Sequence, residues 1–387
     1  MWAIALISLP VTTFPLFSSI SNAQVTPLAL LPFFILLIVW SLPIIIKRGK
    51  LAKESLPLVL FTLIAIISCA AAYFYNIPGF KGKTVFGQEI RSLITLAIGL
   101  TFFIVTATWV QDSDRLKRSL KYITIGGLIS LGWTGVQAFY IFKHYDQYPA
   151  WVREIQSWFV VFSPTFIARS GRVNGLTYEA SWFAHQMVMI YLPVWIATSY
   201  YKTSVFKFRV WRLSIENILL VFGIAAFFLS SPRIGLLSFF LIILYVFTRY
   251  NLVIYRKLVD RLMTTRLFQK SASSSSTRSS ASIISGLLIF SVYALFFALI
   301  FIFAVLRDWR LTLLVSKPPT PSEIVGLLTL NETASMELSN RFIFLERMVF
   351  WFTGWNVFNQ FPWLGVGLGN AGFFFPKLAP AMGWSSF

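Results

Sequence analysis

Long apolar runs are the feature of this sequence that most restricts its fold. Nine of them recur, at residues 2–18, 27–46, 56–76, 92–111, 120–142, 180–200, 213–231, 232–250 and 283–306. Runs near 20 residues can cross a bilayer as helices, and solid runs exclude the short alternation of a β-barrel. We therefore expect an all-α polytopic transmembrane bundle over residues 1–306. Because no Lys or Arg precedes the first run, it is expected to be a retained span and not a signal peptide.

The net charge of +19 follows the expected topology. Nineteen of the 33 Lys and Arg residues lie in alternate loops, at 47–54, 112–121, 200–212 and 249–282. Basic residues collect in cytoplasmic loops, so these loops and the N-terminus are predicted to be cytoplasmic. The excess charge thus indicates membrane topology and not nucleic-acid binding. A single cysteine, Cys69, excludes a disulfide within the chain and a two-cysteine metal site.

The first polar motif is "RSGRVNGLTYEASWFAHQ", residues 169–186, just before a predicted span. Arg169 and Arg172 alternate with glycines, Thr177 is expected to cap the next helix, and Glu179 falls in its first turn. An arginine here can hold an anionic ligand. It can equally be an interfacial anchor that meets lipid headgroups.

The second motif, "FLSSPRIGLL" at residues 228–237, places Arg233 in a tight hinge between two predicted spans on the outer side. An arginine there opposes the usual charge bias of outer loops. The alternative is a side chain that extends to the lipid headgroups.

The third motif lies in the large outer loop predicted at residues 307–387, where a helix is expected over 341–360. Its aromatic content suggests that this amphipathic helix lies against the membrane surface or the bundle. It begins at Arg341, and Arg347 and Trp351 share a face because they are four residues apart. That pair can bind an anionic sugar phosphate, or it can be a cation–π pair with no further role.

A glycine-rich stretch, "FPWLGVGLGNAGFFFP", follows that helix at residues 361–376. A dinucleotide-binding loop requires a preceding β-strand within an alternating βα pattern, and neither is present. The glycines therefore predict a tight turn. Its backbone N–H groups can bind an anion, or the turn can pack closely against a span.

Together these three motifs resemble the O-antigen ligase and O-antigen polymerase family of bacterial membrane glycosyltransferases. The resemblance rests on "RVNGLTYEAS", on "SSPRIGLL", and on an arginine followed by a tryptophan, a proline and a G-x-G-x-G-N turn, over roughly residues 90–376. In this sequence the last motif consists of Arg347, Trp351, Pro362, Gly365, Gly367, Gly369 and Asn370.

The resemblance implies transfer of a glycan from undecaprenyl pyrophosphate to an acceptor hydroxyl, on lipid A-core or a growing polysaccharide. The site would lie on the periplasmic face of the bacterial inner membrane, without a cofactor or metal. Arg172, Arg233 and Arg347 would bind the pyrophosphate, and Glu179 would be the catalytic base. Further substrate-binding residues would be Arg169, Arg341, Trp351, Gly365, Gly367, Gly369 and Asn370.

The sequence departs from the family pattern near its end. Family members have a histidine further along the large outer loop and then about three more spans, whereas this chain holds only His144 and His185. We therefore expect a truncated form that is inactive by itself. The alternative function is a transporter or flippase of lipid-linked glycans. Such proteins usually keep ionisable residues near mid-membrane, and this sequence has almost none there.

Overall fold

The computed structural model describes most of the chain. It covers residues 1–21, 26–48, 55–79, 82–161, 166–206, 209–210, 213–230, 241, 244–245, 251, 253–264, 275–307, 312, 316–328, 337–338 and 345–378. These residues form two compact units, of which one comprises Met1–Ser230 with Pro319–Phe387 and the other Ser231–Pro318.

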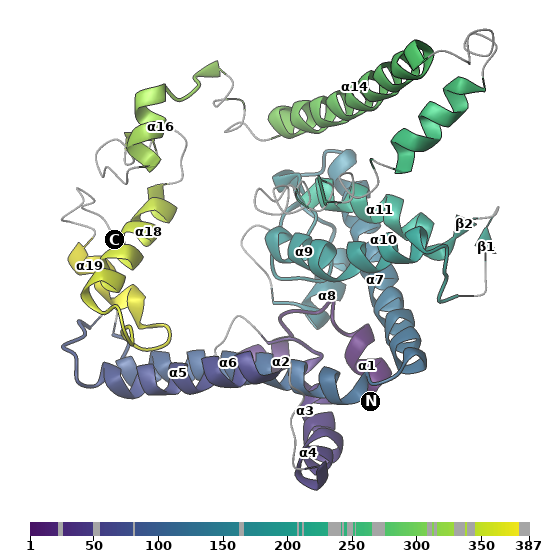
Figure 1. The fold of residues 1–387 in the computed structure, drawn as a ribbon. Coiled ribbons are helices and arrows are strands. Elements are labelled where there is room, and N and C mark those ends of the chain that lie inside the picture. Colours follow the sequence, from purple (N-terminus) through teal and green to yellow (C-terminus); the bar gives the residue numbers. More distant parts are fainter. Residues whose placement is uncertain are drawn as a thin grey trace. The chain divides into compact units, whose positions relative to one another are not determined.

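The described part is mostly helical, as expected. Its α-helices in the first half are α1 (Trp2–Ile7), α2 (Pro15–Ser21), α3 (Leu30–Leu36), α4 (Leu42–Arg48), α5 (Leu56–Ala72), α6 (Val85–Trp109), α7 (Ser113–Phe142) and α8 (Ala150–Phe159). Later come α9 (Ala180–Gln186), α10 (Leu192–Tyr200), α11 (Ile215–Ser230), α14 (Ser275–Arg307), α16 (Pro321–Leu328), α18 (Leu345–Gln360) and α19 (Phe375–Leu378). Two short strands, β1 (Arg209–Val210) and β2 (Leu213–Ser214), form an antiparallel hairpin (Figure 1).

Four short helical turns of other geometry complete the described structure. The turns η1 (Leu37–Ser41) and η4 (Met187–Tyr191) are π-helical, and η3 (Ala168–Ser170) and η5 (Asn370–Phe374) are 3₁₀-helical. Each π turn continues directly from one α-helix into the next, so that residues 30–48 and 180–200 are helical throughout.

Three helices among the described residues are long and apolar enough to cross a membrane, which is fewer than the nine expected. They are Leu30–Lys47, Val85–Trp109 and Ser113–Phe142. The apolar helices Leu56–Ala72 and Ile215–Ser230, and the apolar stretch Ser279–Leu295, are shorter. Most of the span expected at 232–250 falls outside the described residues.

The first expected span, at 2–18, is not a single helix. α1 ends at Ile7, and Thr13 instead forms a parallel β-bridge with Thr26. Phe14 N donates to Thr26 O at 2.8 Å, and Thr26 N donates to Thr12 O at 3.1 Å. Pro10 has no N–H for a helix interior, and its ring clashes with the preceding turn. The apolar composition of residues 2–18 therefore gave no sign that the helix ends at Ile7.

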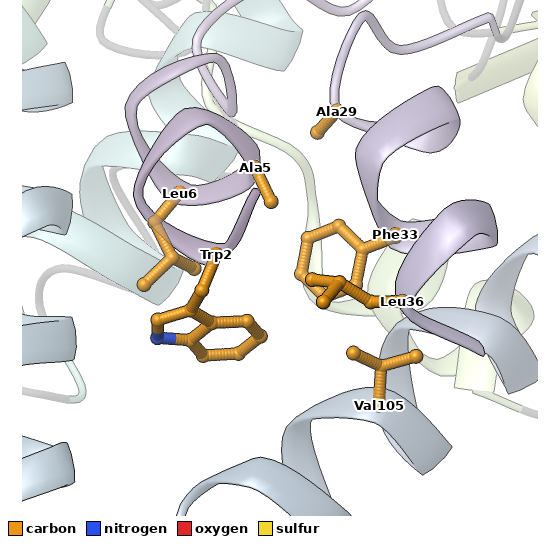
Figure 2. Close-up of a cluster of buried hydrophobic side chains, with 7 residues drawn as sticks. All are labelled: Trp2, Ala5, Leu6, Ala29, Phe33, Leu36 and Val105. Atoms are coloured by element: carbon orange, nitrogen blue, oxygen red, sulfur yellow. The ribbon is translucent and has the colours of Figure 1, made fainter. Parts of the chain in front are cut away.

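A buried apolar cluster joins α1, α3 and α6. Figure 2 shows Trp2 and Ala5 of α1 facing Phe33 of α3, with Leu6 beside Trp2 and Val105 of α6 near Leu36. The Trp2 ring meets the Phe33 ring edge to face at 5.6 Å and stacks on the Trp109 ring at 5.4 Å. Aromatic pairs of this kind add about 0.5–1.5 kcal/mol beyond the area that they bury.

A second packing centre is Trp195 of α10, which is fully buried between two glycines. A Cβ atom built on Gly127 of α7 would lie 2.7 Å from the indole, and one on Gly223 of α11 would lie 2.6 Å from it. Any larger residue at either position would collide with the ring. The glycines thus allow α7, α10 and α11 to pack closely, and α10 and α11 lie side by side in Figure 1.

A charged and aromatic cluster marks the turn between α6 and α7. Asp112 caps α7 by accepting the N–H of Arg115 at 2.7 Å, and the two side chains form an ion pair at 3.2 Å. The Arg115 guanidinium lies over the rings of Trp40 and Trp109, at 5.7 and 5.5 Å from their centroids. These contacts hold Arg115 at the start of α7. Arg115 belongs to the segment 112–121 that the sequence predicts to be a cytoplasmic loop.

Candidate functional site

The segment that carries the first motif, residues 169–179, is called the arginine loop here. Its central residues 173–177 are buried, although they belong to no regular element. Gln137 of α7 provides the main support, because its Oε1 accepts the N–H groups of Asn174 at 2.9 Å and Gly175 at 3.0 Å. Its Nε2 donates to Gly175 O at 3.0 Å. A single buried amide side chain thus satisfies three backbone groups of the loop.

A second amide supports the same point from α8. Gln156 Nε2 donates to Gly175 O at 3.3 Å, and Gln156 Oε1 accepts a hydrogen bond from Trp133 Nε1 of α7. Gly175 has φ +57°, and a Cβ there would lie 2.7 Å from the Phe183 ring. Glycine is therefore required both by the backbone conformation and by the packing.

Arg172 connects the arginine loop to the end of α11. Its Nε donates to Ser230 O at 3.0 Å, and Val173 N donates to Leu229 O at 3.3 Å. The Arg172 side chain is half-buried. Arg233 follows Ser230 by only three residues in the sequence. The first motif therefore contacts the start of the second motif, since Leu229 and Ser230 are its second and third residues.

Four of the predicted arginines can be described only in part or not at all. Arg233 and Arg341 lie outside the described residues. Arg169 belongs to η3 and Arg347 to α18, but only their backbones are described. Whether the arginines converge on one point is therefore still a prediction.

Glu179 is the N-cap residue of α9 and not a residue of its first turn. Its Oε2 accepts a hydrogen bond from Ser181 Oγ at 3.1 Å, and the side chain is half-buried. Thr177 does not cap this helix, contrary to expectation. Its hydroxyl lies inside the loop, 2.8 Å from Asn174 O and 2.7 Å from Glu179 O. The loop thus places a carboxylate at a helix N-terminus, where negative charge is favoured.

The stretch called the glycine turn here, residues 364–370, follows α18. Gly365, Gly367 and Gly369 all adopt the left-handed region, with φ of +67°, +87° and +86°. The N–H of Gly367 donates to Ser68 Oγ of α5 at 3.1 Å. Ser68 Oγ in turn donates to Leu364 O. The predicted tight turn is confirmed. The sequence left two alternatives for this turn, anion binding and close packing against a span, and the N–H contact of Gly367 with Ser68 belongs to the second.

Asn370 fixes the glycine turn to α6. Its Nδ2 donates to Glu89 Oε1 at 2.7 Å and to Val366 O at 2.9 Å, and both side chains are buried. A Cβ on Gly367 would lie 2.7 Å from Asn370 Nδ2 and 3.0 Å from Ala72 Cβ. The glycine therefore lets the turn approach α5 and α6 closely enough for this bond.

Sequence reasoning missed Gln137, Gln156 and Glu89. Gln137 lies in an apolar run, Glu89 just before one, and Gln156 in a predicted outer segment. Each binds a segment at least 19 positions away along the chain. Local spacing carries no sign of such contacts. A signal was available only for Gln137, an amide side chain inside a predicted span, since a buried polar group needs a partner.

The predicted tryptophan, Trp351, lies on α18 and is exposed. α18 includes residue 347, so Arg347 and Trp351 do share one helix at the predicted spacing. The glycine turn ends this helix and binds α5 and α6, so it also anchors α18. Within the described ranges, no group of three or more His, Cys, Asp or Glu side chains is placed to hold a metal ion.

Tyr148, near the arginine loop, is a buried residue whose pKa is set by its burial. Tyr148 precedes α8, and its ring stacks on Phe166 at 4.8 Å between centroids. Burial raises the pKa of the Tyr148 hydroxyl far above its usual range, because the phenolate form would be poorly solvated. The neutral ring therefore belongs to a small apolar cluster that includes Phe166 and Ala168, the residue just before the arginine loop.

The arrangement as a whole presents a guanidinium and a carboxylate on a rigid loop, with hydrogen bonds from three helices holding that loop. Such a loop can bind an oxyanion and accept a proton without reorganising. Comparisons of the chain with protein-family models, with curated proteins and with solved structures gave no match.

Proposed function

We propose that the protein is a membrane glycosyltransferase that uses a glycan linked to undecaprenyl pyrophosphate. The acceptor is a hydroxyl of lipid A-core or of a growing polysaccharide, on the periplasmic face of the bacterial inner membrane. The observation that supports this most is the contact of Arg172 with Ser230. It joins the arginine loop to the helix end that precedes Arg233, so two of the three motifs meet.

In the proposed reaction the bond between the anomeric carbon and a pyrophosphate oxygen breaks. A new bond forms between that carbon and the acceptor oxygen, and the hydroxyl proton passes to a carboxylate. Glu179 is the candidate for that base, because it lies on the same loop as Arg172. The lipid pyrophosphate leaves with increased negative charge, which a guanidinium stabilises through parallel N–H bonds.

The glycine turn has a supporting role in this proposal. Gly365, Gly367 and Gly369 allow the turn to bind α5 and α6, and Asn370 fixes it to Glu89. The turn thereby holds the end of α18, the helix that carries Arg347 and Trp351. We infer that these residues position α18 for the substrate.

The test is glycan transfer by membranes that express the protein as its gene encodes it. Arg172→Ala should lose about 2–4 kcal/mol of transition-state stabilisation, by analogy with removal of one oxyanion donor. Arg172→Lys should restore only part of the rate, because an ammonium cannot reproduce the two-pronged contact. Arg153→Ala is the matched control, because Arg153 is exposed on α8, and it should keep the normal rate.

Amide hydrogen exchange across residues 170–180 separates a chemical role from a structural one. Normal exchange with a lost rate supports pyrophosphate binding by Arg172. A near-normal rate in Arg172→Ala, at matched protein level, would leave the interfacial-anchor alternative in its place.

A further inference from the structure

α8, which the sequence did not predict, has three chemically different faces. Val152 and Gln156 are buried against the protein. Arg153 and Glu154 are exposed and polar. Trp151 and Trp158 are also exposed, at 45% and 59%, and they lie seven residues apart on one side of the helix. A helix packed only against its own protein would turn these large rings inward.

The length of α7 places α8 at a membrane boundary. The last basic residue near the start of α7 is Lys121, and its last residue is Phe142. At 1.5 Å per residue this interval is about 32 Å long, which matches the hydrocarbon thickness of about 30 Å. Since charged residues lie at one boundary, Phe142 reaches the other, and α8 begins eight residues later.

The exposed apolar surface continues from α7 onto α8. Phe139 and Phe142 are exposed near the end of α7, as lipid-facing side chains of a span would be. The Trp151 ring lies 6.3 Å from the ring of Tyr140 and 6.3 Å from that of Trp133, both on α7. α8 is thus attached to the final turns of a span, with its tryptophans next to that lipid-facing surface.

We propose that α8 is an interfacial helix that lies in the surface of a phospholipid bilayer. Trp151 and Trp158 enter the region between headgroups and acyl chains, which tryptophan prefers, while Arg153, on the opposite side of the helix, faces water. From the buried face, Gln156 bonds Gly175 O, so the membrane surface sets the depth of the arginine loop. This inference rests on α7 crossing the membrane and does not depend on the transfer reaction.

The test uses nitroxide labels on single cysteines in a Cys69→Ser background. The protein is placed in nanodiscs of phosphatidylethanolamine and phosphatidylglycerol. Collision rates are measured with oxygen, which concentrates in lipid, and with a neutral nickel chelate, which stays in water. Labels replace Trp151 and Trp158 on one face, and Arg153 on the opposite face. A label at Phe139 is the control for lipid exposure on α7.

We expect oxygen collisions to dominate at 151, 158 and 139, and nickel collisions to dominate at 153. The logarithm of the ratio should therefore change sign between the two faces of α8. If 139 reports lipid while 151 and 158 report water, the helix does not lie in the membrane surface. If 151 and 158 are inaccessible to both reagents, another protein surface covers them, and the proposal is equally overturned.

Discussion

Gln137→Ala should loosen the arginine loop more than any other single truncation near it. The change removes the acceptor of two buried N–H groups, those of Asn174 and Gly175. Gly175 O keeps the hydrogen bond from Gln156 at 3.3 Å. Each buried donor left without a partner costs about 1–3 kcal/mol, so the local cost is about 2–6 kcal/mol.

Hydrogen exchange in nanodiscs, read by mass spectrometry, measures this cost directly. At about 1.4 kcal/mol per tenfold change, amides of residues 172–178 should exchange about 30-fold to about 20,000-fold faster. Leu128→Ala is the control on the same helix, because Leu128 is exposed and bonds no part of the loop through its side chain. Exchange there should match the unaltered protein.

The result that would refute the reasoning is specific. If Gln137→Ala folds normally and residues 172–178 keep their protection, Gln137 does not hold the loop. Equal acceleration of exchange along all of α7 would indicate general destabilisation and would also contradict a local support role.

Three further changes test other parts of the structure. Gly367→Ala should destabilise the protein by at least about 1–2 kcal/mol in thermal unfolding, because of its left-handed backbone and close neighbours. Gly372→Ala should be neutral, because a Cβ there would meet only the Phe375 ring, at the ordinary contact distance of 4.0 Å. Raising the pH above about 10, the pKa of an exposed tyrosine, should reduce stability through the raised pKa of buried Tyr148, and Tyr148→Phe should remove that contribution. Glu216→Ala leaves Val205 N without the carboxylate that accepts it at 2.8 Å, so limited proteolysis near residue 205 should accelerate, unlike in the exposed-residue control Glu154→Ala.

The apolar runs predicted the existence of α6 and α7 and where they end, because a long solid run at one helix length has few alternatives. Both helices begin seven residues earlier than predicted, at Val85 and Ser113. The prediction failed at the first run, where Pro10 breaks the helix and Thr13 bridges Thr26. Hydropathy averages over such a break. The earlier start of α6 also means that Glu89 was placed in a loop when it lies in the first turns of a helix.

The site was predictable as motifs but not as contacts. The sequence places Arg172 and Glu179 in one short motif, but it predicts Glu179 in the first turn of the next helix, whereas the structure makes Glu179 the N-cap residue. The sequence does not reveal that Gln137 and Gln156 hold the arginine loop, since those partners come from α7 and α8. α8 itself escaped notice because its ten residues mix tryptophans with Arg153 and Glu154, a pattern that resembles a polar loop.

The π turn η4 has a consequence for how this protein can change over evolution. Phe183, Met187, Tyr191 and Trp195 are all buried at steps of four residues. In a regular α-helix each such step overshoots one turn by roughly 40°, so three steps would rotate the stripe by roughly 120°. The wider π turn, whose hydrogen bonds run from i to i+5, takes up part of that rotation.

Loss of one residue from Met187–Tyr191 would therefore change the packing of the helix that follows. It would rotate Leu192–Tyr200 by roughly 100° and remove Trp195 from the space between Gly127 and Gly223. Homologous chains that lack the extra residue should carry larger side chains at both glycine positions. Positions 127, 195 and 223 should then vary together, although they lie on three different helices.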